Sequence, residues 1–294
     1  MATAWKHVGA GRITRDESDW RLPHTITLVK VQVVIPSLNQ GRYIGAAIRS
    51  VLDQSTEVDL ELVIVDACSS DETEVEIAQA LRVPHRARVS VIRELDDGQS
   101  DAINKGVAAG EGEVVSWLNA DDVLLPGSLA RVARFFKEAD RNVAVVYGDI
   151  YFIDADGRTT GTLRGLPFHR ADLLWGPGYI PQPATFIRRD AWEAVSGVRR
   201  ELHYTMDVDV WLRISARWRV EHLPEVLAAF RHHENQKTVT AARSIRAEWQ
   251  RVQYEHACAD LGRKPWPLES SVRKMTVRAR RRIRRASDSL RRAA

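Results

Sequence analysis

Cysteine and long apolar runs are both scarce in this chain of 294 residues. Cys68 and Cys258 stand far apart, so they fit neither a metal-ligand spacing nor a disulfide framework. No stretch approaches the roughly 18 consecutive apolar residues of a membrane-spanning helix. The first 20 residues are interrupted by charges and lack the apolar segment of a secretory signal. We therefore expect a cytoplasmic protein, free in solution or peripheral at the inner face of the membrane.

Two common phosphate-binding motifs are also missing. The P-loop pattern G-x-x-x-x-G-K-[ST] occurs nowhere in the chain. Gly9 and Gly11 open a possible dinucleotide fingerprint, but Thr14 stands where that motif needs glycine and no strand pattern precedes it. The sequence therefore supports neither a P-loop enzyme nor a Rossmann dehydrogenase.

Acidic residues are almost absent from the C-terminal segment 270–294. It holds ten of the 43 Lys and Arg residues and one of the 39 Asp and Glu residues, so the net charge of +4 hides a mildly acidic body. Apolar residues recur in the segment at three- and four-residue spacing: Val272, Met275, Ala279, Ile283, Ala286 and Leu290. This pattern predicts a basic amphipathic helix that binds an anionic membrane surface, with a solvated helix or a disordered arm as the alternative. The acidic body predicts no nucleic-acid partner.

Short apolar runs alternate with helical patterns through the first half of the chain. The β-branched-rich runs that predict buried strands are 31–36, 60–67, 88–94, 113–120 and 143–150. Apolar residues in 43–52 recur at helical spacing, and polar residues at 69–71 and 100–101 can cap two further helices. This alternation predicts an α/β fold with a mostly parallel central sheet.

Polar residues collect where the predicted strands end. They are Ser37, Asn39, Asp66, Asp96, Asp97, Asn119, Asp121 and Asp122. Each could cap a helix or fix a turn. Because ligands of such sheets bind beyond the carboxyl ends of the strands, we expect these groups to surround one ligand. Several carboxylates at one edge favour a divalent metal that holds a diphosphate.

Five segments resemble the family 2 glycosyltransferases, which have the GT-A fold. They are VVIPSLNQGRYIGAAIRSVLDQS, LVIVDACSSDET, DDGQSDAINKGVAAGEGEVVSWLNADD, QPATFIRRDAW and MDVDVWLRIS. The resemblance runs in order from about residue 31 to about residue 238. It implies inverting transfer of a sugar from a nucleotide sugar to an acceptor hydroxyl, assisted by Mg²⁺ or Mn²⁺.

The same resemblance implies the donor-binding residues. It places Pro36, Ser37, Asn39 and Asp66 on the base and ribose, with Asp96 nearby. We expect the donor to be a UDP-sugar.

The resemblance also places the metal beside Asn119-Ala120-Asp121, which occupies the D-x-D position of the family. Asp121 is then the metal ligand. Asn119 departs from the family acid, and its amide suits a ribose hydroxyl better than a metal. Asp122 either adds a ligand or orients Asp121. His233 follows an arginine and, as in some relatives, closes over the metal and diphosphate.

Asp207 and Asp209 are the candidates for the general base that takes the proton of the acceptor hydroxyl. Helical spacing predicts that both lie in the first turn of a helix, where acids also simply complement the helix dipole. Asp207 matches the base of the family's E-D pair, but Met206 replaces the preceding glutamate, so the choice between the two acids stays open.

The domain organisation follows from these assignments. We expect an N-terminal extension at 1–30, a nucleotide-sugar-binding half at 31–122, an acceptor-binding half at 123–239, and a C-terminal helical region with a basic tail at 240–294. Trp175 and Tyr179 offer either an aromatic platform for a sugar or core packing.

Bacterial polysaccharide or glycolipid synthesis, with a saccharide or lipid-linked acceptor, is the expected role of this enzyme. The alternatives are a nucleotidyltransferase and a non-catalytic carbohydrate- or nucleic-acid-binding protein.

Overall fold

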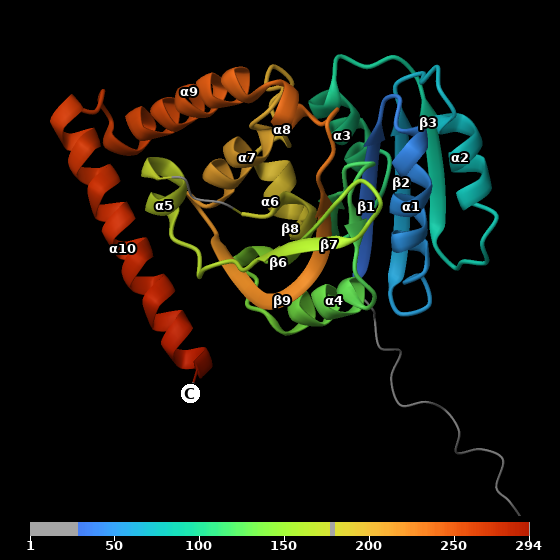
Figure 1. The fold of residues 1–294 in the computed structure, drawn as a ribbon, viewed down its shortest axis with the longest axis horizontal. Coiled ribbons are helices and arrows are strands. Elements are labelled where there is room, and N and C mark those ends of the chain that lie inside the picture. The colour runs from blue at the N-terminus through green and yellow to red at the C-terminus, as the bar shows by residue number, and fades with distance from the viewer. Residues whose placement is uncertain (1–28, 177–179, 294) are drawn as a thin grey trace, which may run out of the picture.

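The computed structural model describes residues 29–176 and 180–293, and within them nine strands form one sheet (Figure 1). The strand order is β3-β2-β1-β4-β8-β6-β9-β5, with β7 paired to β6 outside this path. Among the described residues, no helix is both long enough and apolar enough to cross a bilayer.

The first half of the chain alternates strands and helices as its hydrophobic pattern predicts. Its elements are β1 (Lys30–Ser37), α1 (Gly41–Leu52), β2 (Asp59–Asp66), α2 (Thr73–Ala80), β3 (Arg88–Arg93), α3 (Gln99–Ala108) and β4 (Val114–Trp117). All four strands are parallel, and Ser37 at the end of β1 lies in register with Asp66 at the end of β2. The predicted parallel α/β arrangement is therefore confirmed for this half.

The second half adds strands of both directions. Its elements are β5 (Val123–Leu124), α4 (Ser128–Glu138), β6 (Val143–Ile153), β7 (Thr159–Leu163), α5 (Arg170–Trp175), the 3-10 turn η1 (Gln182–Ala184), β8 (Thr185–Arg188), α6 (Arg189–Ala194), α7 (Met206–Ile214) and β9 (Arg219–Arg231). β8 runs antiparallel to both β4 and β6, whereas β6 and β9 are parallel. The sheet as a whole is thus mixed, because the strand that joins its two halves is reversed.

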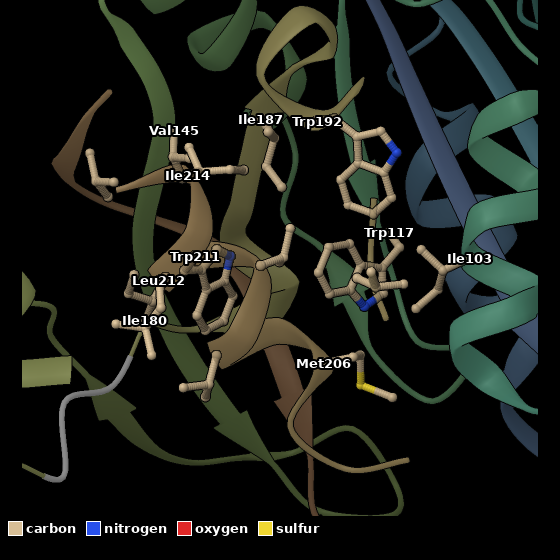
Figure 2. Close-up of a cluster of buried hydrophobic side chains, with 14 of the residues drawn as sticks. Ile103, Trp117, Val145, Ile180, Ile187, Trp192, Met206, Trp211, Leu212 and Ile214 are labelled. Carbon is tan, nitrogen blue, oxygen red and sulfur yellow. The ribbon is translucent and has the colours of Figure 1, made fainter. Parts of the chain in front are cut away.

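Two apolar clusters cover the two faces of this sheet. Alternate residues of one strand point to opposite faces, so Val33 and Ile35 of β1 join the cluster under α1, α2 and α4, while Val34 joins the other. The second cluster contains Trp117, Trp192, Trp211 and Met206 (Figure 2). At this face α3 approaches the sheet so closely that a Cβ at Gly106 would overlap Val34. The core therefore fixes α3 and α7 beside the ends of the central strands.

Three helices complete the chain: α8 (Lys237–Thr240), α9 (Ala242–Leu261) and α10 (Pro267–Ala293). The predicted tail helix is thus present. It contacts the body through Val277, which is 2% exposed and was not part of the predicted apolar stripe. Val272 and Met275 of that stripe are 47% and 59% exposed. Val272 and Met275 therefore face away from the body, whereas Arg280 and Arg284 of α10 contact it through His169 and Asp172.

Candidate active site

A pocket of about 310 Å³ opens beyond the carboxyl ends of β1 and β4. Six residues expected from the sequence line it: Pro36, Ser37, Asp96, Asn119, Asp121 and His233. The hydroxyl of Ser37 is buried and has no hydrogen-bond partner within 29–176 and 180–293. A buried polar atom without a partner costs free energy. The Ser37 hydroxyl is therefore available to a polar ligand.

Asn39 and Asp66 lie outside the lining of this pocket and brace its loops. Asp66 is 1% exposed, accepts the backbone N–H of Ser69 at 3.0 Å and pairs with Arg93 at 3.5 Å. Asn39 adopts a left-handed φ of 54° and accepts the N–H of Ser70 at 2.9 Å. Together they tie the loop after β1 to the loop after β2. Their expected contacts with base and ribose stay predictions.

Asp121 and His233 meet inside the pocket, with Oδ2 of Asp121 3.0 Å from Nε2 of His233. Arg231 holds the backbone of Asp121 by donating to its carbonyl oxygen at 2.8 Å. The ring of Tyr43 lies 4.8 Å from the imidazole, and Gln236 accepts the His233 N–H at 2.7 Å. The pair is therefore fixed by contacts from the helix α1 and from the segment that follows β9.

The donor set at this point fits a divalent cation that a substrate shares. No group of three or more His, Cys, Asp or Glu side chains within the described part of the chain is arranged to hold a metal. Mg²⁺ is commonly bound by one or two carboxylates, several waters and substrate phosphates, and imidazole also suits Mn²⁺. Asp121 and His233 therefore suffice as protein ligands only when a diphosphate supplies further oxygens.

Asp122 turns into the protein, away from the pocket. It is 1% exposed, its Oδ1 accepts the N–H of Arg231 at 2.9 Å, and its Oδ2 accepts the amide of Asn119 at 3.3 Å. Burial, together with the adjacent charge of Asp121, raises the pKa of Asp122 well above its usual value. Of the two roles expected for Asp122, these contacts favour orienting its neighbours over direct ligation.

A row of hydrogen bonds crosses the pocket and includes Gln99, which the sequence analysis did not single out. Lys237 donates to Oε1 of Gln99 at 2.8 Å, and Nε2 of Gln99 donates to Asn119 at 2.8 Å. Burial lowers the pKa of Lys237, against the opposing fields of Asp121, Asp96 and Glu248. Gln99 lies at the N-terminus of α3, directly after Asp96-Asp97-Gly98, and that position was the signal available in the sequence.

Asp207 and Asp209 lie in the first turn of α7, as predicted, but in different surroundings. Asp209 is 1% exposed and is engaged by Arg213 at 2.7 Å, Arg199 at 3.2 Å and His256 at 2.9 Å. Burial raises the pKa of Asp209, but His256 and the two arginines outweigh that effect and lower it. Asp209 thus serves as an anchor for other elements.

Asp207 has no cationic partner in the described residues and accepts only the N–H of Val208 at 2.7 Å. It is half-buried and lies outside the lining of the donor pocket. Desolvation raises its pKa to about 7, and the charge of Glu248 adds to the rise. A carboxylate with a pKa near neutrality is suited to exchange a proton with an approaching hydroxyl.

Glu248 of α9 holds the turn that leads into α7. Its Oε1 accepts the N–H of Tyr204 at 2.9 Å and that of Thr205 at 2.8 Å, and its Oε2 accepts the N–H of His203 at 3.2 Å. Burial raises the pKa of Glu248, but these N–H groups lower it overall. No local signal in the sequence marks this contact, because about 40 residues separate its two sides.

The two aromatic residues considered as a sugar platform, Trp175 and Tyr179, have different outcomes. Trp175 is 7% exposed and belongs to the core, with the guanidinium of Arg273 5.3 Å from its ring. Tyr179 lies outside the described residues.

The fold is that of the GT-A glycosyltransferases. The structure of S. aureus TarS 1-349 in complex with UDP-GlcNAc is similar to this one, with a TM-score of 0.62 and 20% sequence identity. The similarity covers 78% of this chain and 66% of the TarS chain. The mannosyltransferase PcManGT from Pyrobaculum calidifontis, solved with GDP-Man and Mn²⁺, is also similar, with a TM-score of 0.57 and 19% sequence identity. This similarity covers 85% of this chain and 73% of the PcManGT chain.

The sequence places the chain in a family. The model of Glycosyl transferase family 2 matches residues 32–196. A PGL/p-HBAD biosynthesis glycosyltransferase of Mycobacterium tuberculosis is 36% identical over 62% of this chain and 68% of its own length. An uncharacterized glycosyltransferase of Nostoc is 39% identical over 45% of this chain, a match that spans only 39% of the Nostoc protein. This chain therefore belongs to glycosyl transferase family 2.

Proposed function

We propose that this protein transfers a sugar, with inversion, from a UDP-sugar to the hydroxyl of an acceptor. The observation that carries the proposal is the pocket beyond β1 and β4, where the free hydroxyl of Ser37, the Asp121–His233 pair and Lys237 surround one space. Its volume of about 310 Å³ lies within the usual range of small-molecule sites. The solved relatives that bind UDP-GlcNAc and GDP-Man support a nucleotide-sugar ligand.

In this proposal the donor lies across the strand ends. Ser37 and Asp96 face the nucleoside. Asn119 bonds a ribose hydroxyl through the second lone pair of its Oδ1 or the second N–H of its Nδ2, since Gln99 and Asp122 each engage only one of these. Lys237 donates to an oxygen of the diphosphate and neutralises part of its charge. Asp121 and His233 would hold Mg²⁺ or Mn²⁺, which when bound stabilises the charge of the departing diphosphate.

Asp207 is the proposed general base. Its pKa of about 7 lets the ionised carboxylate accept the proton of an acceptor hydroxyl near neutral pH. Asp209 is proposed to hold α7 in place, because its oxygens accept from Arg213, contact His256 at hydrogen-bond distance and form an ion pair with Arg199. Attack from the side opposite the diphosphate inverts the anomeric carbon.

The acceptor is proposed to be a saccharide or a lipid-linked saccharide of bacterial polysaccharide or glycolipid synthesis. The similarity to a glycosyltransferase of PGL/p-HBAD biosynthesis supports a role in a biosynthetic pathway. The exposed Val272 and Met275, on a helix rich in arginine, support association with an anionic membrane surface.

A thermal-shift screen of nucleoside diphosphates and nucleotide sugars, with and without Mn²⁺, tests the proposal. We expect UDP and UDP-sugars to raise the melting temperature, more so with Mn²⁺, because binding to the native state stabilises it. The Ser37→Ala variant removes the buried hydroxyl that lacks a partner among the described residues, and it should reduce the shift. If no nucleoside diphosphate changes the melting temperature, the pocket is not a donor site.

A further inference from the structure

A second recess lies far from the donor pocket in sequence, between α9 and α10. Figure 1 shows these two long helices meeting at an angle beside α5. A groove of about 560 Å³ lies between them, and we call it the α9–α10 groove. Its lining includes Trp175, Trp249, Ile245, Arg246, Lys274 and Arg278. The groove thus combines aromatic and aliphatic surface with three cations.

The three cations of the groove have no acidic partner among the residues that the structure describes. Arg246, Lys274 and Arg278 make no ion pair there, even though carboxylates stand on the same two helices. Those carboxylates are already committed. Glu255 binds Arg199 at 2.9 Å, and Asp260 binds Arg170 at 2.8 Å. A surplus of positive charge therefore remains at the groove, on a body that is otherwise acidic.

Glu269 of α10 is committed in the same way, with Arg263 and Arg273 each 2.9 Å away. The remaining arginines of α10 that contact the body also have partners, since Arg280 bonds His169 and Arg284 pairs with Asp172 at 3.3 Å. The cations on the docked face of α10 thus hold the helix to the body. Lys274 and Arg278 of α10 line the groove instead, and neither makes an ion pair among the described residues.

The aromatic side of the groove is rigid. Trp249 packs against the core cluster, and Trp175 is 7% exposed beneath the guanidinium of Arg273. Gln253 fixes the floor by donating to the carbonyl oxygens of Leu173 and Gly176 at 2.7 and 2.9 Å. Indole rings held in this way accept an apolar or sugar portion, while neighbouring cations bind an anionic group.

We propose that the α9–α10 groove binds the phosphate group of a phosphate-bearing amphiphile. Arg246, Lys274 and Arg278 contact the phosphate, and Trp249 with Ile245 covers the apolar portion next to it. The proposal rests on the proposed function in one respect, namely that this amphiphile is the acceptor or its carrier.

Isothermal titration with farnesyl phosphate below its micelle concentration tests the proposal. We expect the wild-type protein to bind it, inorganic phosphate to compete at higher concentration, and farnesol to bind far more weakly because it lacks the anion. In the variant Arg246→Gln/Lys274→Gln/Arg278→Gln, binding should weaken by about a hundred-fold. Trp249→Ala should weaken farnesyl phosphate more than inorganic phosphate.

A matched variant removes the same charge outside the groove: Arg243→Gln/Lys264→Gln/Arg282→Gln. These three residues are exposed and are not part of the lining. The control variant should bind farnesyl phosphate as the wild type does. Equal losses in both triple variants, or equal binding of farnesol and farnesyl phosphate, would overturn the proposal.

Vesicles of phosphatidylglycerol distinguish a lipid head group from a soluble phosphate. If the groove variant and the control variant lose vesicle binding equally, vesicle binding depends on surface charge alone, and the lipid head group is not the ligand of the groove. A selective loss in the groove variant would assign the head group to the groove. Binding of UDP, measured on every variant, reports the donor pocket separately. Failure of the proposed function would abolish UDP binding in the wild type and leave the farnesyl phosphate result standing.

Discussion

The carboxylate of Glu248, on α9, accepts the backbone N–H of Thr205 at 2.8 Å and so holds the residue that precedes α7. α7 has no side-chain cap of its own, and Glu248, about 40 residues later in α9, fixes the turn that leads into it. Because Asp207 is the second residue of α7, the same carboxylate stands close to the proposed base and raises its pKa. Glu248 therefore acts on Asp207 in two ways: it holds the residue before α7, and its charge raises the pKa of Asp207.

Replacement of Glu248 by glutamine should move the pH profile of the enzyme. Asp207 acts as a base only when ionised, so the rate falls as the pH drops through its pKa of about 7. Removing the negative charge of Glu248 favours ionisation of Asp207 and lowers that pKa. We therefore expect the acidic limb of kcat/KM to shift to lower pH in Glu248→Gln.

Glu255→Gln is the matched control, because Glu255 lies on the same helix and binds Arg199 instead of α7. Its acidic limb should stay in place. Glu248→Ala should in addition lose about 1 kcal/mol of stability, since the N–H groups before α7 lose their acceptor. A fall in activity without any shift of the acidic limb in Glu248→Gln would show that Glu248 is only structural.

Replacement of Asp207 by asparagine should lower the transfer rate about 10²- to 10⁴-fold. It should leave the affinity for UDP unchanged, because the base acts only when the acceptor loses its proton. Steady-state rates and UDP titrations on one preparation check this. Asp209→Asn should instead lower the melting temperature, because it weakens contacts with Arg213, Arg199 and His256. An inactive but stable Asp209→Asn beside an active Asp207→Asn would reverse the assignment.

Replacement of Asp121 by asparagine should weaken the Mn²⁺-dependent part of UDP binding roughly tenfold or more, a loss of about 1.4 kcal/mol or greater. His233→Ala should act in the same direction, and the two effects should not add, because the side chains lie 3.0 Å apart at one site. UDP titrations with and without Mn²⁺ measure both. Unchanged metal dependence in Asp121→Asn would contradict the assignment of this ligand.

Replacement of the exposed stripe of α10 should release the protein from membranes. We expect the wild type to sediment with anionic vesicles, to be displaced by salt, and to ignore neutral vesicles. Val272→Ser/Met275→Ser should bind less, since these side chains are 47% and 59% exposed on a basic helix. Val91→Ser/Leu95→Ser removes apolar groups elsewhere that are 46% and 78% exposed, and this variant should bind normally. Equal sedimentation with neutral vesicles would argue against this surface.

Local patterns predicted the parallel half of the sheet, because each strand and helix there pairs with its neighbour in the chain. The reversal at β8 escaped prediction, since its direction depends on pairing with β4 and β6 across long separations. The docking of α10 on the body was likewise not predicted. Apolar spacing marked Val272 and Met275 as a membrane-binding face, and the contact with the body is made by Val277 and Arg273 instead.

The residues of the candidate site likewise fall into those that local sequence patterns mark and those that only long-range contacts bring in. Asp121, His233 and Ser37 could be identified because family segments and strand ends mark them. Gln99 and Glu248 join the site through hydrogen bonds whose two ends lie far apart in the chain. The burial of Asp122 beneath Arg231 likewise depends on β9, which no pattern around residue 122 reveals.

Product analysis after incubation with a UDP-sugar, Mn²⁺ and a lipid-linked acceptor tests the central claim most directly. We predict that UDP is released in amounts equal to the sugar transferred, that the new glycosidic bond has the inverted anomeric configuration, and that Asp207→Asn yields neither while still binding UDP. Release of pyrophosphate in place of UDP, or retention of the donor's anomeric configuration, would contradict it.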